Sequence, residues 1–542
     1  MSMRVLAACA FLLTVFGCTS SPAADDQSPP TTTFKVNSHL VVLDVVVTDK
    51  NGQPVRGLTA GDFSVKENGK LQAIAFFTPP TEAASSHSSP RPLPPGIYSN
   101  RAKYRLPGGI PTIIVIDAAN TPVTDQIYAR QQLMEFLNQQ SKSSNPVAVF
   151  TLTDHLSLVH DFSTAQQELA AVSGTAPVQA PSSTDLRAPN AAPLAPNGMA
   201  ATMFAMGGGS NFTYQEIELQ LHQRVEVTLL AMHRLTHMFG GIPGRKNIIW
   251  LTASLPFALL PSDWKVGGVG MTSSPVSHTS TDRAAMSQYD EKIRDLEAEM
   301  TSARISIYPV DVRGLAIQSP VDLGDSQATM RQIAQETGGK AIVNRNDIGN
   351  AVATAVNDST ASYSLAYYPT DKNLDPQYRR IEIKVDRQDT EALYRHGYFD
   401  MNPEPLKGKK ANQELGDALR DQVPDTLVIF DVKVTPIDQH QAHVDFLVDT
   451  NSISVDDNPK GKKIDLSFYV AAFSPKGKML NSDSSELDKT YPLDKFQSIQ
   501  HNGVLLRIDT NIPSDAKELR LAVKDNKSGS IGTAIAPLAG QK

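Results

Sequence analysis

The chain of 542 residues contains only two cysteines, Cys9 and Cys18, and both lie within its first 18 residues. The rest of the chain therefore has neither a disulfide framework nor a thiolate metal site. Aromatic residues make up only 6% of the sequence, and no long Lys/Arg block interleaved with aromatic residues occurs. With a formal net charge of −7, this composition argues against nucleic acid as a partner.

The sequence also lacks the short motifs of common hydrolases and nucleotide-binding enzymes. It has no Gly-x-Ser-x-Gly, no His-Glu-x-x-His and no P-loop. Residues 207–211 (GGGSN) are rich in glycine, but no strand immediately precedes them and no Gly-Lys follows. These absences predict a protein that is not an enzyme and has no identified small-molecule substrate.

The amino terminus has the pattern of an export signal. Arg4 is followed by a short apolar run from Val5 to Phe16, which cannot span a bilayer. Residues 15–18 (VFGC) resemble a bacterial lipobox, which implies lipidation of Cys18 and a membrane-anchored lipoprotein of the cell envelope. Cleavage after Ala23 is the alternative, and it would give a soluble periplasmic or secreted protein. Both alternatives predict export.

Hydrophobic patterns divide the remaining chain into modules. Alternating apolar residues predict strands before residue 77, and a Pro/Ser-rich stretch then predicts a linker. The expected organisation is a signal peptide over 1–18, a tether over 19–33, an N-terminal β module over 34–77, a linker over 78–109, an α/β domain over 110–360, a β segment over 361–402 packing with the N-terminal module, and a C-terminal β-sandwich over 410–542.

Strands and helices alternate in the α/β domain, which predicts a doubly wound, mostly parallel sheet with crossover helices. About six strands are expected. The expected strands cover 113–116, 147–152, 156–159 at an edge, 247–251, 305–310 and 341–343, and the expected helices lie near 124–140, 214–239, 283–303 and 328–337, with another capped by Asp347.

Polar residues follow several of these strands. The β-branched run of residues 112–116 stops at Asp117, and ligands of parallel sheets bind beyond the carboxyl ends of the strands. Asp117, Asn120 and Thr121 are therefore expected at a site on this edge. Further candidates for the same binding face are Asp154, Thr252 and Ser254.

Several segments together resemble the von Willebrand factor A-like proteins, in particular the acidobacterial-type exported group with a divergent A-related domain. The matching pieces are FKVNSHLVVLDVVVTDKNGQPVRGLTAGDF, IIVIDAANTP, GIPGRKNIIWLTASLP, ISIYPVDVRG, and YSLAYYPTD with YRHGYF. They cover most of residues 34–400. The resemblance implies an A-type α/β fold and an exported protein with a binding role.

The resemblance also implies a position for a metal ion. In A domains an Asp-x-Ser-x-Ser motif, a Thr and a second Asp bind Mg²⁺ or Mn²⁺. Here the motif reads Asp117-Ala-Ala-Asn120-Thr121, and residues 252–254 (TAS) stand where the second Asp is expected. Asp117, Asn120 and Thr121 would therefore hold Mg²⁺ or Mn²⁺ only weakly. The alternative is that Asp117 accepts hydrogen bonds from the backbone of its own loop.

A second group of candidates lies on the expected helix 214–239. His222, Glu226, His233 and His237 share one flank at helical spacing, and His and Glu one turn apart can bind a metal. A solvated flank explains the same pattern. The pair Arg245-Lys246 is expected to meet an anion or to form a solvated basic turn.

Two segments interrupt the α/β pattern, 174–211 and 261–280, and each is expected to be either a binding element or an unstructured insert. The leading hypothesis is an exported, lipid-anchored protein that binds another protein or envelope macromolecule, as an adhesion or scaffold module. An envelope enzyme with an acid/His site near Asp117, and a structural spacer without a ligand site, are the alternatives.

Overall fold

The computed structural model describes residues 40–80, 93–101, 111–139, 147–163, 211–257, 288–314, 320–347, 349, 352–353, 355–356, 361–371, 377–401 and 404–538. These residues belong to one structural unit, Leu40–Lys542. Cys18, the tether and most of the segments 174–211 and 261–280 lie outside them. In the described part, no helix is long and apolar enough to cross a membrane.

A five-stranded sheet forms the centre of the α/β domain. Its strands are β6 (Thr112–Asp117), β7 (Val147–Leu152), β8 (Leu156–Ser163), β9 (Lys246–Thr252) and β10 (Ile305–Asp311), in the order β10-β9-β6-β7-β8. Neighbouring strands run parallel, except β8, which is antiparallel to β7. The chain thus starts this sheet in the middle, at β6, and builds outward in both directions.

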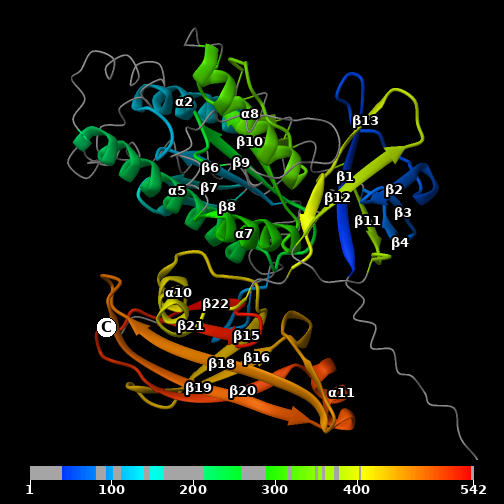
Figure 1. Ribbon diagram of the computed structural model, residues 1–542. Helices are drawn as coiled ribbons and strands as arrows, with labels where there is room; N and C mark the ends of the chain where they lie inside the picture. Colours follow the sequence, from blue (N-terminus) through cyan, green and yellow to red (C-terminus); the bar gives the residue numbers. More distant parts are fainter. Residues whose placement is uncertain are drawn as a thin grey trace, which may run out of the picture. The chain divides into compact units, whose positions relative to one another are not determined.

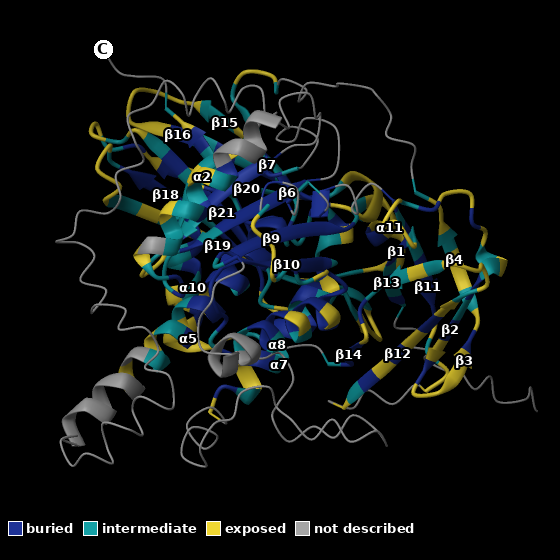
Figure 2. Cartoon of the chain, turned by 90° about the horizontal axis from the view of Figure 1, so that it is seen from above, coloured by how far each residue is buried: buried dark blue, intermediate teal, exposed yellow. Residues whose placement is uncertain are grey.

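Helices cover both faces of this sheet (Figure 1). The helices are α2 (Val123–Gln139), α5 (Asn211–Phe239), α7 (Asp290–Ser302) and α8 (Pro320–Thr337). One core combines Val115 and Trp250 with buried residues of α5, α7 and α8. The opposite core combines Ile114 and Tyr308 with α2 and with buried residues among 352–356. Strands β6, β9 and β10 are consequently buried almost throughout (Figure 2).

Strands that precede the α/β domain in the sequence and strands that follow it together form a second module. One sheet has the order β13-β1-β11-β4 and the other β14-β12-β2-β3, and their buried residues share one core. Its elements are β1 (Val41–Asp49), a 3-10 turn at Ala60–Asp62, β2 (Phe63–Glu67), β3 (Lys70–Gln72), β4 (Ile74–Thr78), β11 (Ser362–Tyr367), β12 (Tyr378–Val385), β13 (Thr390–Leu393) and β14 (Gly397–Phe399).

The interior of this module contains a buried charged cluster. Arg379 pairs with Glu67 at 2.9 Å and with Asp400 at 2.7 Å, and Tyr367 and Tyr398 donate their hydroxyls to Glu67 at 2.6 and 3.0 Å. Every charge here has an opposite charge or a donor beside it, which is the condition under which buried ions are tolerated.

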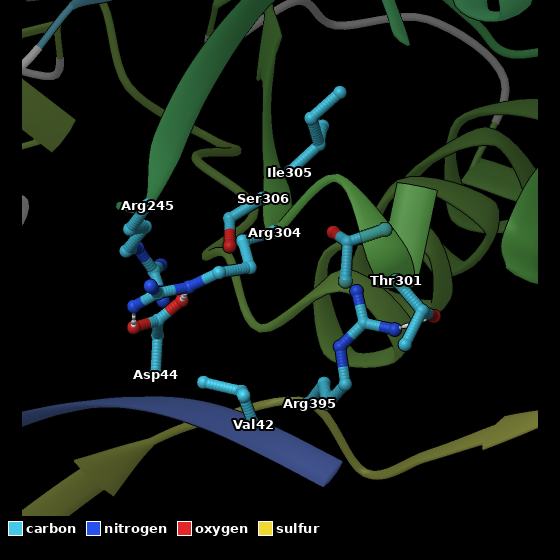
Figure 3. A pocket seen from close by; sticks show the side chains of 9 residues that line it. Val42, Asp44, Arg245, Thr301, Arg304, Ile305, Ser306 and Arg395 are labelled. Atoms are coloured by element: carbon cyan, nitrogen blue, oxygen red, sulfur yellow. Dashed lines mark hydrogen bonds and ion pairs between the residues drawn. The ribbon is translucent and has the colours of Figure 1, made fainter. Parts of the chain in front are cut away.

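An ion pair joins the β module to the α/β domain. Arg304, just before β10, donates to the carboxylate of Asp44 on β1, with Nε 2.9 Å from Oδ2. Ser364 on β11 donates to the same carboxylate at 2.8 Å. Figure 3 shows Arg304 directed at Asp44, and Arg395 directed at Thr301. The cavity between them measures about 10 Å³, which is about the space of one water molecule, so this joint is closed.

The C-terminal region consists of two antiparallel sheets that share one core. One has the order β20-β16-β15-β5. The other has the order β17-β18-β21-β22, and β19 also pairs with β18. The elements are β5 (Ile97–Ser99), α10 (Gly408–Arg420), β15 (Phe430–Pro436), β16 (Gln441–Val448), a 3-10 turn at Thr450–Ser452, β17 (Asp456–Asn458), β18 (Gly461–Phe473), β19 (Met479–Tyr491), α11 (Leu493–Asn502), β20 (Val504–Asn511), β21 (Glu518–Asp525) and β22 (Ile531–Pro537).

Four sequence-based expectations differ from these elements. The expected strand at 341–343 is a single bridge, where Ile342 pairs with Val310, and the helix expected at 328–337 already begins at Pro320. Within the expected linker, β5 pairs with β15. The C-terminal region, expected as a β-sandwich, also contains two helices, α10 and α11.

Candidate functional site

Asp117 lies at the carboxyl end of β6 and is completely buried. Its Oδ1 accepts the backbone N–H of Asn120 at 2.9 Å, and its Oδ2 accepts the side-chain amide of Asn120 at 2.9 Å and the indole N–H of Trp250 at 2.9 Å. Burial raises the pKa of Asp117, while the donors of Trp250 and Asn120 act in the opposite direction. The carboxylate is thus surrounded by neutral donors of the protein itself.

Four other residues expected at this edge, Asn120, Thr121, Thr252 and Ser254, are also buried, and hydrogen bonds connect their loops. Thr121 accepts the backbone N–H of Ala253 at 3.0 Å. Thr252 donates its hydroxyl to the carbonyl of Ser254 at 2.6 Å. Ser254 in turn donates to the carbonyl of Asn120 at 3.4 Å. The structure therefore brings together five predicted residues, Asp117, Asn120, Thr121, Thr252 and Ser254, in one hydrogen-bonded network.

A positively charged side chain that the sequence reasoning did not single out completes this network. Arg224, on α5, donates from Nε to Oδ1 of Asn120 at 2.9 Å and from Nη2 to the hydroxyl of Ser254 at 3.1 Å. Burial lowers the pKa of Arg224, and the nearby carboxylate of Asp117 acts in the opposite direction. Arg224 thus brings a cation of the protein to the residues that were expected to hold a metal ion.

Asp154 lies at the same edge but outside this network. It is exposed, in the turn between β7 and β8. Its Oδ1 accepts a hydrogen bond from the Thr153 hydroxyl at 2.9 Å and lies 2.7 Å from Nδ1 of His155. The turn lies beside the Asp117 loop, because the backbone N–H groups of Ala118 and Ala119 donate to the carbonyl of Leu152 at 2.8 and 3.0 Å. Asp154 therefore presents a carboxylate to solvent next to the buried network.

The four candidates on α5 separate into two groups. Nδ1 of His222 lies 2.9 Å from the hydroxyl of Tyr289, and Glu226 forms an exposed ion pair with Lys292 at 2.7 Å. His233 and His237 lie further along the helix, with ring centroids 4.1 Å apart. Arg224 and His233 are nine positions apart, which corresponds to about 13 Å along the helix. The two histidines therefore do not reach Asp117.

His233 instead lies between two glutamates. Its Nδ1 is 2.8 Å from Oε2 of Glu299 on α7, and its Nε2 is 3.3 Å from Oε1 of Glu414 on α10. Burial alone would lower the pKa of His233, but the two carboxylates outweigh burial and raise it to about 10. For His237 burial lowers the pKa well below its usual value, and the neighbouring cations His233 and Arg234 act in the same direction.

This second polar cluster borders a large cavity. The cavity measures about 780 Å³ and is lined by α5, α7, α10 and residues 527–530. The end of α5 is fixed nearby, because Thr426 donates its backbone N–H to the carbonyl of His237 at 2.9 Å and its hydroxyl to that of Met238 at 3.0 Å. These contacts satisfy helix-terminal carbonyls that would otherwise lack donors.

The expectation of a solvated basic turn at Arg245-Lys246 is wrong. Both side chains are buried. Arg245 donates to the hydroxyl of Tyr308 at 2.9 Å and to the carbonyl of Gly338 at 2.6 Å, and Lys246 donates to the carbonyl of Ile242 at 2.7 Å. Burial lowers the pKa of Lys246 to about 7, and Arg304 acts in the same direction. Carbonyl and hydroxyl groups of the protein therefore accept the hydrogen bonds of Arg245 and Lys246, in place of the solvent or anion that was expected.

Comparisons with known proteins give no family assignment. No protein-family model matches the chain, and no curated protein matches it. Similar solved structures include an aerotolerance-related membrane protein from Bacteroides fragilis, with 12% identity, a TM-score of 0.22, and coverage of 46% of this chain and 99% of that one. The pilus adhesin SpaC from Lactobacillus rhamnosus GG, in its open conformation, has 8% identity, a TM-score of 0.27, and coverage of 88% and 69%.

A proximal thread matrix protein of the mussel byssus is also similar, with 10% identity, a TM-score of 0.22, and coverage of 46% of this chain and 48% of that one. All three likenesses are too weak to carry an argument about function. What the structure establishes is a mixed α/β architecture with one largely parallel sheet and several antiparallel sheets.

Proposed function

We propose that this chain is an exported protein of the bacterial cell envelope, and that residues 110–360 form a divergent von Willebrand A-like domain that binds another protein or envelope macromolecule. In this proposal Cys18 carries the lipid anchor. The chain acts as an adhesion or scaffold module and not as an enzyme.

The order of the central sheet supports this assignment. The chain leaves β6 toward β7 and β8 on one side, and then returns to β9 and β10 on the other. Open α/β sheets bind their ligands at such a switch point, beyond the carboxyl ends of the strands. In this sheet the switch point is the edge that carries Asp117, Asn120 and Thr252.

The observation that carries the binding role is the closed network at this edge. Asp117 accepts from Asn120 and Trp250, and Arg224 holds Asn120 and Ser254. A base or nucleophile needs a position near the atom that it attacks, whereas these groups are buried against one another. Such a network fixes the loops around it, as a rigid recognition surface requires. Asp154, which lies outside the network, would be an exposed residue of that surface.

The geometry gives less support to an enzyme with an acid/His site near Asp117. At the other end of α5, His233 bonds to Glu299 and Glu414, and Nε2 of His237 lies 4.0 Å from Glu299. The hydrogen-bond donors to the Asp117 carboxylate include Asn120 and Trp250, and no histidine is among those recorded for the described residues. A structural spacer is the remaining alternative, and the following experiment separates it from a binding module.

Site-specific photo-cross-linking in the native envelope tests the proposal. A photoreactive residue is placed at Asp154, on the carboxyl edge, and in a matched control at Pro243, which is exposed before β9 at the opposite edge. We expect a discrete cross-linked product from position 154 and none from position 243. Identical patterns from both positions, or no product from either, would refute binding at this edge and favour the spacer.

A further inference from the structure

We propose that His233, His237 and Glu414 form a binding site for a divalent transition metal ion of the zinc class, with Glu299 orienting one of the imidazoles. The site lies away from the carboxyl edge of the sheet, so this inference is independent of the function proposed above. It connects α5 of the α/β domain to α10 of the C-terminal region.

The ligand atoms are already gathered. His233, His237 and Glu414 each offer one donor atom, and these atoms all lie within 4.8 Å of one another. Zinc bound by nitrogen and oxygen at about 2.0–2.1 Å in tetrahedral geometry places its ligands about 3.3 Å apart. Nε2 of His233 and Oε1 of Glu414 are 3.3 Å apart, so this pair already has the separation that such an ion requires.

Helix geometry supplies the third ligand. His233 and His237 are four residues apart on α5 and lie on the same face of the helix, which is the spacing of paired histidines in helical zinc sites. His237 is buried, and its Nδ1 has no hydrogen-bond partner among the described residues. Buried polar atoms are normally paired, and the His237 imidazole, which has a donor atom within 4.8 Å of those of His233 and Glu414, is a group to which a metal can bind.

Glu299 has the role of an orienting residue. Its Oε2 lies 2.8 Å from Nδ1 of His233 and 4.0 Å from Nε2 of His237. A carboxylate on the far nitrogen of a metal-binding histidine fixes its tautomer and raises its basicity. Because Nδ1 of His233 faces Glu299, its Nε2 faces Glu414. Nε2 is therefore the nitrogen of His233 that would bind the ion.

The ion also has a route to the site. His233, His237, Glu299 and Glu414 all line the cavity of about 780 Å³. Three protein ligands leave a fourth tetrahedral position, which water from this cavity can fill. Because Glu414 comes from α10 and both histidines from α5, a bound ion would cross-link the two helices and stabilise the joint between them.

Calorimetric titration of Zn²⁺ into the full chain tests the site, and the visible absorption of bound Co²⁺ reports its ligands independently. We expect one equivalent of Zn²⁺ to bind and to raise the melting temperature. His237→Asn and Glu414→Gln should weaken binding by about 100-fold or more, since second-shell changes alone cost about 10- to 100-fold. Glu299→Gln should weaken Zn²⁺ binding by only about 10- to 100-fold.

His222→Asn is the matched control, because His222 lies on the same helix but contacts Tyr289. This variant should bind Zn²⁺ as the unmodified chain does. Melting without metal shows whether each variant is folded, and Glu414→Gln keeps the shape of a side chain that is only partly buried. No stoichiometric binding, or equal binding by the folded His237→Asn and Glu414→Gln variants, would overturn the proposal and leave the cluster as an ion pair of His233 with two glutamates.

Discussion

Trp250 on β9 donates its indole N–H to Asp117 at the end of β6, with 2.9 Å between Nε1 and Oδ2. Both side chains are completely buried. The bond links the carboxyl ends of two neighbouring parallel strands at the point where the chain changes direction across the sheet. It therefore ties the predicted site residue to the core of the domain.

Removing this donor should destabilise the fold. In Trp250→Phe the Asp117 carboxylate loses one of its donors while remaining buried, and a hydrogen bond to a charged group contributes about 1.5–3 kcal/mol. Denaturant unfolding of Trp250→Phe, Asp117→Asn and the double variant separates this bond from the lost volume of the indole. We expect a coupling of about 1–3 kcal/mol. Additivity within about 0.5 kcal/mol would contradict a stabilising bond.

Arg224 should determine the response of the carboxyl edge to Mg²⁺ and Mn²⁺. Its guanidinium donates to Asn120 and Ser254, so an added cation would meet a like charge at these residues. We expect millimolar Mg²⁺ or Mn²⁺ to leave the melting temperature unchanged. In Arg224→Met the repulsion is absent, and Mn²⁺ should restore part of the stability lost with the arginine.

Lys292→Met, which removes an exposed cation on α7, is the control for the change in net charge. A shift of melting temperature by Mg²⁺ in the unmodified chain would instead favour an occupied A-type site. No response of a folded Arg224→Met variant to Mn²⁺ would show that the arginine is not what excludes the ion.

The central strands were predictable because their burial leaves a direct trace in the sequence. Residues 113–116 and 248–251 are unbroken apolar runs, and both lie in strands of the sheet. Strand β19 leaves no such trace. Its sequence, MLNSDSSELDKTY, has no buried residue, and it pairs with the preceding strand β18. Its strand conformation therefore depends on pairing with β18 and not on an apolar pattern of its own.

The candidate site was predictable only in part for a similar reason. The position of Asp117 after a buried strand indicated the edge of the sheet, and the structure groups Asn120, Thr252 and Ser254 with it. Arg224 was not predicted, because it lies 104 residues from Asn120 in sequence and a helical arginine is usually solvated. The pairing of His233 with Glu414 spans 181 residues and was equally inaccessible.

Lipidation of Cys18 should decide where the protein is found. We expect the unmodified chain in the membrane fraction of its native host, because a lipidated cysteine anchors the mature amino terminus. Cys18→Ser should move it to the soluble envelope fraction or leave it unprocessed. Cys9→Ser, within the apolar run, is the control and should change nothing. Equal processing and solubility of the Cys18→Ser variant and the unmodified chain would favour cleavage after Ala23.

The ion pair between Asp44 and Arg304 should contribute strongly to the joint between the β module and the α/β domain. Asp44 is almost buried, with 9% of its side chain exposed, so Asp44→Ala leaves Arg304 without its carboxylate. Breaking a buried pair costs about 3–5 kcal/mol. The exposed pair of Lys50 and Asp389 is the control, and Lys50→Ala should cost less than about 1 kcal/mol. Equal losses in denaturant unfolding would contradict this difference.

Glu336 should make the fold less stable as the pH rises from acid to neutral. Burial raises the pKa of Glu336 from 4.5 to about 7, and the Tyr378 hydroxyl acts in the opposite direction. A carboxyl whose pKa is higher in the folded state stabilises the fold below the unfolded pKa, and this contribution is lost as the pH passes the folded pKa. The window is therefore pH 4.5 to 7, and the loss is about 3 kcal/mol.

Glu336→Gln removes the titration but keeps an acceptor for Tyr378, so its stability should change less over this window. The measurement is urea unfolding of both proteins at several pH values, and the quantity to compare is the difference between them, because other buried carboxyls also titrate. Glu391→Gln, at an exposed position, should follow the unmodified chain. An equal loss of stability by Glu336→Gln and the unmodified chain between pH 4.5 and 7 would contradict the prediction. It would mean that the Glu336 carboxyl is already charged in the folded protein at low pH. Groups besides the Tyr378 hydroxyl would then have to stabilise the anion.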